Sequence, residues 1–294
     1  MDIFGIPIQA FLGQLLLGLV NGSFYAMLSL GLAVIFGLLG IVNFAHGALY
    51  MIGAYVAWYV LERFGLGYWW ALVLSPLVVG ALGMLVERTL LKHLYRVDPI
   101  YGLLLTFGVA LIAEGLFREQ FGVSGQSYPV PDLLGGATNL GFMVLPNYRA
   151  WVVFASLTIC LGTWFVIEKT SLGAKLRAGT ENPALVQAFG INVPRMVMLT
   201  YGGGAALAAI AGVLAAPVIQ VTPLMGSNLI IVVFAVVVIG GMGSILGSVI
   251  TGLALGLIEG LTKVFYPEAS NIVVFVIMAI VLVIRPAGLF GKEA

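Results

Sequence analysis

Side chains that commonly carry out chemistry are scarce in this sequence. Its only histidines are His46 and His93, and its only cysteine, Cys160, lies in an apolar stretch where a small buried residue is expected. Metal sites need several His, Cys or carboxylate ligands together. Neither a G-x-S-x-G nucleophile elbow nor a G-x-x-x-x-G-K-S/T phosphate-binding loop occurs. The sequence therefore argues against a metal site, an enzyme and a bound nucleotide, and no cofactor is expected.

Two carboxylates, Glu114 and Glu259, come nearest to the middle of an apolar segment. A proton- or sodium-coupled carrier would place such groups at mid-membrane. Each of the two lies within a turn or two of the end of its segment. Arg118 follows the first and Lys263 the second, at the i+4 spacing of a helix-surface ion pair. We expect interfacial, solvated carboxylates, which weakens the hypothesis of a secondary carrier without removing it.

The composition indicates a membrane protein. Of the 294 residues, 61% are hydrophobic and 9% are charged, and the mean hydropathy is +1.13; about 25% of an average soluble domain is charged. The net charge of +1, without clustered Lys and Arg, excludes a nucleic-acid partner. Uncharged stretches mark the lipid bilayer, because a charge at its centre costs about 2.5 to 3.5 kcal/mol.

Nine apolar cores result when the uncharged stretches are divided at Gly, Pro and Asn clusters. Because a crossing takes about 20 residues, core 48–61 is short and either crosses with help from its flanks or dips in and returns. We predict an all-α, polytopic transmembrane helical bundle of about eight or nine crossings, forming one domain over residues 1–294. The cores are residues 11–42, 48–61, 69–90, 99–117, 150–167, 196–216, 228–242, 245–262 and 270–284.

The orientation follows from the basic residues of short loops, which favour the cytoplasmic side. These residues concentrate in three segments that even numbers of predicted crossings separate, so all three are expected to be cytoplasmic. Tyr68, Trp69 and Trp151 then lie at the outer interface, where aromatic rings prefer to lie. The basic residues are Arg88, Lys92 and Arg96, then Lys169, Lys175, Arg177 and Arg195, and finally Arg285 and Lys292.

Glycine is abundant, at 39 residues, and much of it has helical spacing. Gly252, Gly256 and Gly260 follow one another at every fourth position, and Gly18 and Gly22 make a further pair. In lipid, small residues let helix backbones approach closely. We expect tight packing within the chain, and a subunit interface is the alternative.

A weak internal similarity links the two halves. When Gly22-Ser23 is aligned with Gly226-Ser227, three further identities follow, although chance in so biased a composition is the alternative. Helix-interrupting residues adjoin both copies, at residues 21–23 and 223–228. Interrupted apolar segments in two halves are a pointer to a transport path. The further identities pair Ile35 with Ile239, Gly37 with Gly241 and Ile41 with Ile245.

The longest basic loop, residues 169–195, predicts a short amphipathic helix. Thr180 or Asn182 can cap it, Pro183 suits its first turn, and Gly190 can end it in the left-handed conformation. The helix is too polar to span a membrane, so it is either a docking element or a helix on the membrane surface. Its apolar face carries Leu185, Ala188 and Phe189.

Several longer motifs are spread over nearly the whole chain. The N-terminal half carries NGSFYA (21–26), GLLGIVNFAHG (37–47) and YMIGAY (50–55); the later half carries GGMGSILG (240–247) and RPAGLFG (285–291). With these motifs, the sequence resembles the integral membrane permeases of ATP-binding-cassette importers for branched-chain amino acids.

The resemblance implies a set of partners. Such a permease pairs with a second homologous permease subunit, two cytoplasmic ATPase subunits and an external, periplasmic substrate-binding protein. It is a multi-pass protein of the bacterial plasma (inner) membrane. The missing phosphate-binding loop fits this arrangement, because ATP would be bound by the partner subunits.

The resemblance also implies a coupling helix at residues 178–191, which seats in a groove on the ATPase. The usual Glu-Ala-Ala opening is replaced here by Glu181-Asn182-Pro183, whereas Gly190 is kept. Docking of the segment is therefore better supported than any single contact. The residues expected to take part in ATPase coupling are Arg177, Glu181, Asn182, Pro183, Ala184, Ala188, Gly190 and Ile191.

A translocation pathway is expected beside the interrupted segments. For Asn43 and His46 the alternative is a role at the start of the helix that begins near Gly47, where backbone groups need polar partners. The candidate pathway residues are Asn21, Ser23, Tyr25, Asn43, His46, Ser227 and Asn228.

The sequence thus predicts a permease subunit of an ATP-driven importer that moves branched-chain, or related small, amino acids into the cytoplasm by alternating access. Three alternatives stay open. They are a permease for urea or short amides, a secondary carrier or channel for small solutes, and a membrane scaffold that does not transport.

Overall fold

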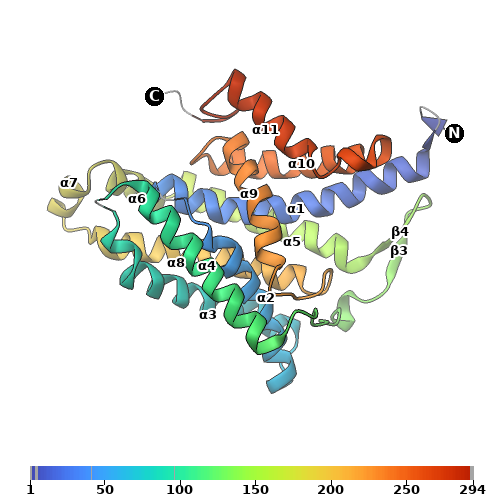
Figure 1. Ribbon diagram of the computed structural model, residues 1–294, viewed down its shortest axis with the longest axis horizontal. Helices are drawn as coiled ribbons and strands as arrows, with labels where there is room; N and C mark the ends of the chain where they lie inside the picture. The colour runs from blue at the N-terminus through green and yellow to red at the C-terminus, as the bar shows by residue number, and fades with distance from the viewer. Residues whose placement is uncertain (1, 4–5, 41, 96, 292–294) are drawn as a thin grey trace.

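The computed structural model describes residues 2–3, 6–40, 42–95 and 97–291, and these are mostly helical (Figure 1). Helices α1, α8 and α10 run along the long axis of the molecule, and α9 crosses them. The longer helices are α1 (Ile8–Leu39), α2 (Ala45–Phe64), α3 (Tyr68–Thr89), α4 (Pro99–Phe121), α5 (Asn147–Lys169), α8 (Val193–Ala215), α9 (Met225–Gly240), α10 (Ile245–Phe265) and α11 (Val273–Ile284).

Shorter elements connect these helices. Helices α6 (Ser171–Glu181) and α7 (Pro183–Ala188) lie between α5 and α8. Strand β1 (Asp2–Ile3) pairs antiparallel with β2 (Ile6–Pro7). Strand β3 (Ala137–Asn139) pairs in the same way with β4 (Val144–Pro146). The described residues also form the 3-10 helices η1 (Leu91–His93), η2 (Asp132–Leu134) and η3 (Pro267–Ala269).

The described residues of each predicted apolar core lie mostly on one helix, a different helix for each core, which confirms the helical class. Local capping chemistry explains several of the boundaries. Helix α4 begins where the Asp98 side chain accepts a 2.9 Å hydrogen bond from the backbone N–H of Ile100. Helix α10 begins where Ser244 accepts one of 3.1 Å from Gly247. Side-chain caps of this kind satisfy N–H groups that the first turn leaves free.

Six of the described helices are long and apolar enough to cross a membrane: α1, α3, α4, α5, α8 and α10. Helices α9 and α11 are apolar but shorter, and α2 does not reach the same apolar content over its 20 residues. The count of eight or nine crossings is therefore not confirmed. At about 1.5 Å rise per residue, the 16 residues of α9 span less than a hydrocarbon core of about 30 Å.

Helix α1 is the centre of the fold and packs most extensively against α10. The two glycine series face each other across this contact: a Cβ atom built on Gly18 would lie 2.6 Å from the carbonyl oxygen of Gly256. One built on Gly22 would lie 3.0 Å from Cα of Leu253. The glycines therefore serve close packing within the chain, as expected, because no side chain fits between the two backbones.

The predicted interruption at residues 21–23 is wrong. Helix α1 continues through them without a break. The hydroxyl of Ser23 donates a 2.8 Å hydrogen bond back to the carbonyl of Leu19 in the same helix. Gly22 is the position where α10 approaches. Packing against α10 thus stabilises a helix whose local sequence favours a break.

The second predicted interruption is present. Helix α8 ends at Ala215 and α9 begins at Met225, and a β-bridge joins Val221 in the connection to Gln126. Gly226-Ser227 starts α9, whereas Gly22-Ser23 lies inside α1, so the two copies of the proposed repeat occupy different places. Its aligned residue Ile41 lies outside the described residues.

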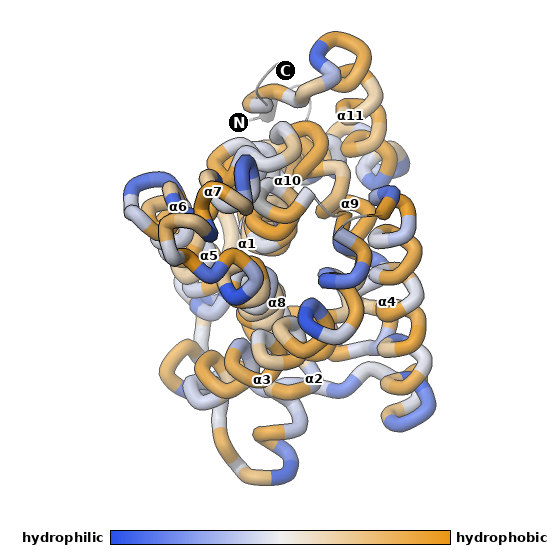
Figure 2. Tube along the Cα trace, turned by 90° about the vertical axis from the view of Figure 1, so that its left-hand side faces the viewer, coloured by the Kyte–Doolittle hydropathy of each residue, from blue (hydrophilic) through white to orange (hydrophobic). Residues whose placement is uncertain are grey.

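The two ends of the molecule differ in their elements. Helices α6 and α7 and the C-terminal end lie at one end of the long axis, and the N-terminal end and the β3–β4 hairpin lie at the other (Figure 1). Viewed from the α6–α7 end, hydrophilic residues gather there and in the loops, whereas the helices are mainly hydrophobic (Figure 2). Tyr68 accepts a 2.9 Å hydrogen bond from the Trp151 indole, which joins two of the expected interface aromatics.

Candidate functional site

The segment of residues 178–191 has the local structure that its sequence predicts. The Asn182 side chain accepts a 3.1 Å hydrogen bond from the backbone N–H of Leu185, Pro183 is the first residue of α7, and Gly190 has a φ of +80°. The preceding helix α6 was not predicted as a separate element. Arg177 fastens it to α5 through bonds to the Ile167 carbonyl and Glu168.

The outer face of α7 is exposed and apolar. The Phe189 side chain is 77% exposed and that of Leu185 is 54% exposed, whereas Val186 is buried toward the protein. Glu181, Ala184, Ala188 and Gly190 are exposed too. Apolar side chains held out from a rigid, capped turn form a surface that a partner can cover.

Two of the predicted basic segments meet at this end of the molecule. Arg88, Lys92 and Arg195 line one cavity of about 490 Å³. A second cavity of about 790 Å³ lies between the end of α1, residues 92–95 and the α6–α8 region, and Thr180 and Pro183 line it. Arg96 and Lys292, also predicted for this side, lie outside the described residues.

This end also contains a buried carboxylate, Glu87, that the sequence patterns do not predict as a functional residue. Glu87 of α3 is 4% exposed and accepts a 2.8 Å hydrogen bond from the hydroxyl of Tyr95. Burial, followed by the bond to Glu87, raises the pKa of the Tyr95 phenol, so the phenol stays protonated as the donor. The partner lies in a loop eight residues further along the chain, a spacing without a recognised pattern.

Asn43 and His46 lie in the short connection from α1 to α2 and at the start of α2. The His46 ring is fully buried, and its Nε2 lies 3.0 Å from the carbonyl oxygen of Leu28 on α1. A Cβ on Gly31 would lie 2.8 Å from Cε1 of His46, so the ring fills the space beside this glycine. Asn43 is also buried, and its side chain lies near the hydroxyl of Tyr201.

The candidate pathway residues Asn21 and Ser23 of α1 have different surroundings. Asn21 lines a polar cavity of about 290 Å³ toward the β3–β4 end, together with Gln14, Arg149 and Lys263. Ser23 is buried and bonded within its own helix. The structure thus places only one of these two polar residues on a cavity.

Tyr25 contacts α10 instead of a cavity. Its hydroxyl donates a 2.6 Å hydrogen bond to Glu259, whose other carboxylate oxygen accepts one of 2.5 Å from Lys263. Glu259 is 7% exposed. The expected ion pair between Glu259 and Lys263 is present. The expectation that Glu259 is solvated is wrong, because α1 covers its carboxylate.

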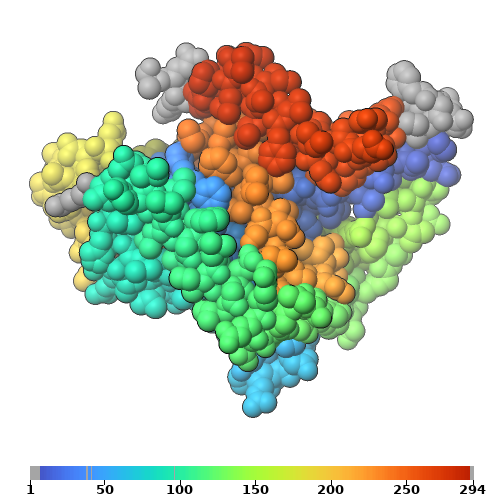
Figure 3. Space-filling view, in the orientation of Figure 1, coloured from blue at the N-terminus to red at the C-terminus, as the bar shows by residue number. Residues whose placement is uncertain are grey.

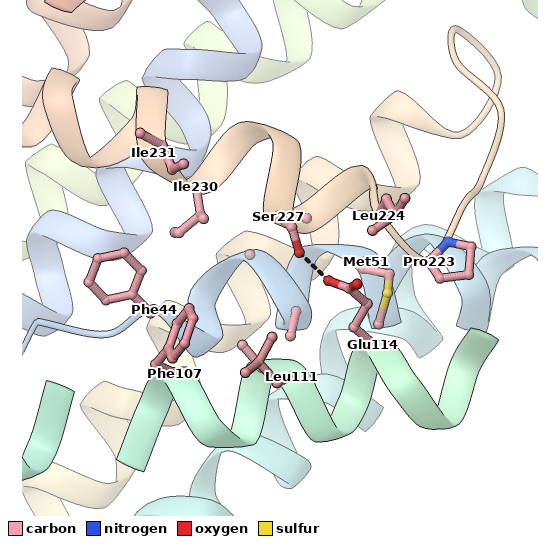
Figure 4. A pocket seen from close by; sticks show the side chains of 14 residues that line it. Phe44, Met51, Phe107, Leu111, Glu114, Pro223, Leu224, Ser227, Ile230 and Ile231 are labelled. Atoms are coloured by element: carbon pink, nitrogen blue, oxygen red, sulfur yellow. Dashed lines mark hydrogen bonds between the residues drawn. The ribbon is translucent and has the colours of Figure 1, made fainter. Parts of the chain in front are cut away.

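Ser227 lines a pocket with Glu114, the other carboxylate singled out in the sequence (Figure 4). The Ser227 hydroxyl donates a hydrogen bond to Glu114, which also accepts one of 2.9 Å from Arg118. The Glu114 side chain is 16% exposed, so it is less solvated than expected. Asn228, the next residue, is exposed.

The predicted pathway residues therefore do not form one site within the subunit. They lie in the α1–α2 connection, at the α1–α10 contact, in the polar cavity and in the Glu114 pocket. Among the described residues, no group of three His, Cys, Asp or Glu side chains lies close enough together to hold a metal ion.

Known proteins resemble this chain over nearly its full length. The family described as "Branched-chain amino acid transport system / permease component" matches residues 14–282. The high-affinity branched-chain amino acid transport system permease protein LivH of Escherichia coli K12 is 30% identical, covering 96% of each chain. The corresponding protein BraD of Pseudomonas aeruginosa is 30% identical and covers 97% of each. LivM of Escherichia coli K12 is 27% identical over 90% of this chain and 67% of its own.

Among solved structures, PsaBC from Streptococcus pneumoniae in complex with a Fab covers 93% of this chain at 13% identity, with a TM-score of 0.47. At that score the likeness alone does not show a shared fold. The family match and the relatives at 30% identity do decide the family. The chain belongs to the branched-chain amino acid transport system permease family, and it is a multi-pass transport subunit of an importer and not an enzyme.

Proposed function

We propose that this permease moves branched-chain amino acids into the cytoplasm of a bacterium, driven by ATP that partner subunits bind and hydrolyse. The observation that carries the proposal is the exposed, capped turn of α7. LivH and BraD, which match nearly the whole chain, are named for high-affinity transport of this substrate class, which supports the same substrates here.

Residues 178–191 are the coupling segment in this proposal. The exposed side chains of Leu185 and Phe189 enter a groove on a cytoplasmic ATPase subunit. The Asn182 cap and the left-handed Gly190 fix the turn, so that movement of the ATPase is transmitted to α6 and α8 instead of being lost in a flexible loop. The residues assigned to coupling are Arg177, Glu181, Asn182, Pro183, Ala184, Ala188, Gly190 and Ile191.

The second permease covers the face formed by α4 and α9 in this proposal. On the side shown in Figure 3, α4 (green) and α9 (orange) lie at the surface. Most of α4 is exposed and apolar, and it packs mainly against α2. LivM, a second kind of permease, also matches this chain, which supports a pair of related permeases.

The remaining partners complete the importer. Two ATPase subunits lie on the α7 side, and an external substrate-binding protein delivers substrate to the side of the β3–β4 hairpin. Residues 1–294 act as one transmembrane domain in the inner membrane. In this proposal the six long helices cross the membrane, the shorter α9 and α11 cross with help from the residues that flank them, and α2 is the candidate for a ninth crossing.

Proteoliposomes test the proposal directly. The complete importer, with both permeases, the ATPases and the binding protein, should accumulate leucine, isoleucine or valine when ATP is supplied to the ATPase side. The purified chain alone should not. Uptake by the chain alone would indicate a carrier or channel, and ATP-driven uptake of urea without amino-acid uptake would contradict the substrate class.

Coupling is tested in the same vesicles. Gly190→Val should reduce ATP-driven uptake while the chain still inserts and assembles, because its φ of +80° is strained for a residue with a Cβ. Gly162→Ala on α5, where nothing lies within 4 Å of the added Cβ, is the matched control. Normal uptake by the Gly190 variant would remove the coupling role from this turn.

A further inference from the structure

The pocket between α2, α4 and α9 is apolar except at one place. It has a volume of about 280 Å³, close to the lower end of small-molecule sites, at about 300 Å³. Of its described lining residues, only Glu114 and Ser227 have polar side chains. Phe44, Met51, Phe107 and Ile230 supply much of the apolar wall. The Glu114–Ser227 pair lies between the Phe44 and Phe107 rings on one side and Met51, Leu224 and Pro223 on the other (Figure 4).

Glu114 has unused capacity to accept hydrogen bonds. One of its carboxylate oxygens accepts from Arg118 and the other from Ser227. A carboxylate can accept about four hydrogen bonds, so these two partners leave room for a further donor. Arg118 pairs with one oxygen of the carboxylate, whereas the other has only the neutral Ser227 hydroxyl as its partner. A bound cationic group would give this second oxygen a charged partner beside the apolar pocket.

Arg118 adds a positive group beside this carboxylate, next to the pocket but not among the residues that line it. It lies one turn further along α4, with its Nη2 atom 2.9 Å from Glu114, and its side chain is about half exposed. A guanidinium has five N–H donors in a planar fork that matches a carboxylate. The bond to Glu114 leaves most of them available to a second anion.

The Glu114–Ser227 bond also connects two helices that otherwise share little. Helix α4 packs mainly against α2. Among the described residues, this is the only side-chain hydrogen bond between α4 and α9. A ligand that replaces the Ser227 hydroxyl at Glu114 would therefore release α9 from α4 on one side of the pocket.

We propose that this pocket binds a zwitterionic aliphatic amino acid inside the permease during transport. Glu114 receives the ammonium group in place of the Ser227 hydroxyl, Arg118 receives the carboxylate, and the apolar wall holds the side chain. The inference rests on the proposed function and adds a substrate site to it. A neutral solute such as urea would use neither charge, and a lipid chain would gain nothing from Glu114.

The test uses the complete importer in proteoliposomes, with leucine uptake and ATP hydrolysis measured on the same preparation. Glu114→Gln keeps the size of the side chain but removes its charge. We expect leucine uptake to fall by about tenfold or more, the scale of about 1.4 kcal/mol, while hydrolysis stimulated by the binding protein stays within about twofold. Glu62→Gln, an exposed carboxylate at the end of α2, is the matched control and should leave both rates unchanged.

A second variant tests the pocket through its size. Ala110→Leu adds bulk to the lining of the pocket without touching a charge. It should lower uptake of leucine more than uptake of alanine, a selectivity change that general damage to the fold would not cause. Equal loss for the two substrates contradicts a binding role.

The remaining outcomes separate this inference from the proposed function. If the wild-type importer shows no ATP-dependent amino-acid uptake, the proposed function fails before any variant is compared. If the wild type transports and Glu114→Gln transports equally well, only the pocket assignment is overturned. Loss of the second permease from Glu114→Gln during purification overturns it too, because the residue would then belong to the subunit interface.

Discussion

The phenolic hydroxyl of Tyr25 on α1 donates a 2.6 Å hydrogen bond to the buried carboxylate of Glu259 on α10. The two residues are 234 positions apart in the sequence, and their helices form the largest contact of the fold. Lys263 supplies the second partner of the carboxylate from the next turn of α10. The bond therefore joins the first and tenth helices at a charge that would otherwise be poorly satisfied.

Tyr25→Phe should destabilise the protein, because it leaves the Glu259 carboxylate buried with Lys263 as its remaining side-chain partner. Hydrogen bonds to charged groups contribute about 1.5 to 3 kcal/mol, so the melting temperature in detergent should fall by several degrees. Tyr59→Phe, on an exposed ring of α2, is the control and should melt like the wild type. An unchanged melting temperature for Tyr25→Phe would show that the bond contributes little to stability.

Gly252→Ala should separate α1 from α10. The added Cβ would lie 2.5 Å from the backbone nitrogen of Ala26, which cannot move without the helix. Overpacking of this kind costs about 1 to 3 kcal/mol, measurable as a lower melting temperature. Gly108→Ala on α4 meets no atom within 4 Å and should match or exceed the wild type, because glycine inside a helix costs about 0.5 to 1 kcal/mol. Equal stability of the two variants would contradict the close helix contact.

Phe189→Ala should lower ATP-driven uptake without lowering the stability of the isolated chain. The ring is 77% exposed, so the chain loses little packing when it is removed. An apolar anchor at an interface commonly contributes 2 kcal/mol or more, so uptake should fall by about tenfold if docking limits it. Leu77→Ala, at an exposed position within α3, is the control. Full uptake by Phe189→Ala would show that α7 does not dock through this side chain.

Tyr128→Phe should make the protein more resistant to alkali. Burial, with a smaller contribution from Tyr68, raises the pKa of Tyr128 from 10 to about 12. Because the unfolded phenol ionises first, the wild type should lose stability from this group as the pH rises above 10, by up to about 1.4 kcal/mol per pH unit until about pH 12. Tyr128→Phe has no phenol at this position to ionise, so it should not lose this stability. Thermal unfolding between pH 8 and 12 measures the difference, with Tyr266→Phe, an exposed ring, as the control.

Identical pH profiles for Tyr128→Phe and the wild type would contradict this account. At neutral pH we expect little change from the substitution, because the Tyr128 hydroxyl has no hydrogen-bond partner among the described residues. Removing a buried hydroxyl without a partner does not leave another polar group unsatisfied.

The sequence by itself determined that the long apolar segments are helical. Each apolar core became a helix because a backbone in lipid must satisfy its own hydrogen bonds. The turn at residues 178–191 was also predictable, since the Asn182 cap and the left-handed Gly190 act on neighbouring residues. Capping interactions of this kind join residues that are only a few positions apart, so the sequence pattern indicates them. Family membership followed from motifs along the same chain, and the comparisons bear it out.

Only the tertiary structure decided which polar residues meet. Gly22 and Ser23 were expected to break a helix, but contact with α10 keeps α1 continuous. Glu259 was expected at a solvated surface and is covered by Tyr25. Ser227 bonds to Glu114, and Glu87 to Tyr95, without any sequence spacing that would indicate it. Such pairs depend on how helices pack, and in lipid that packing is set by small residues and distant partners more than by hydrophobic pattern.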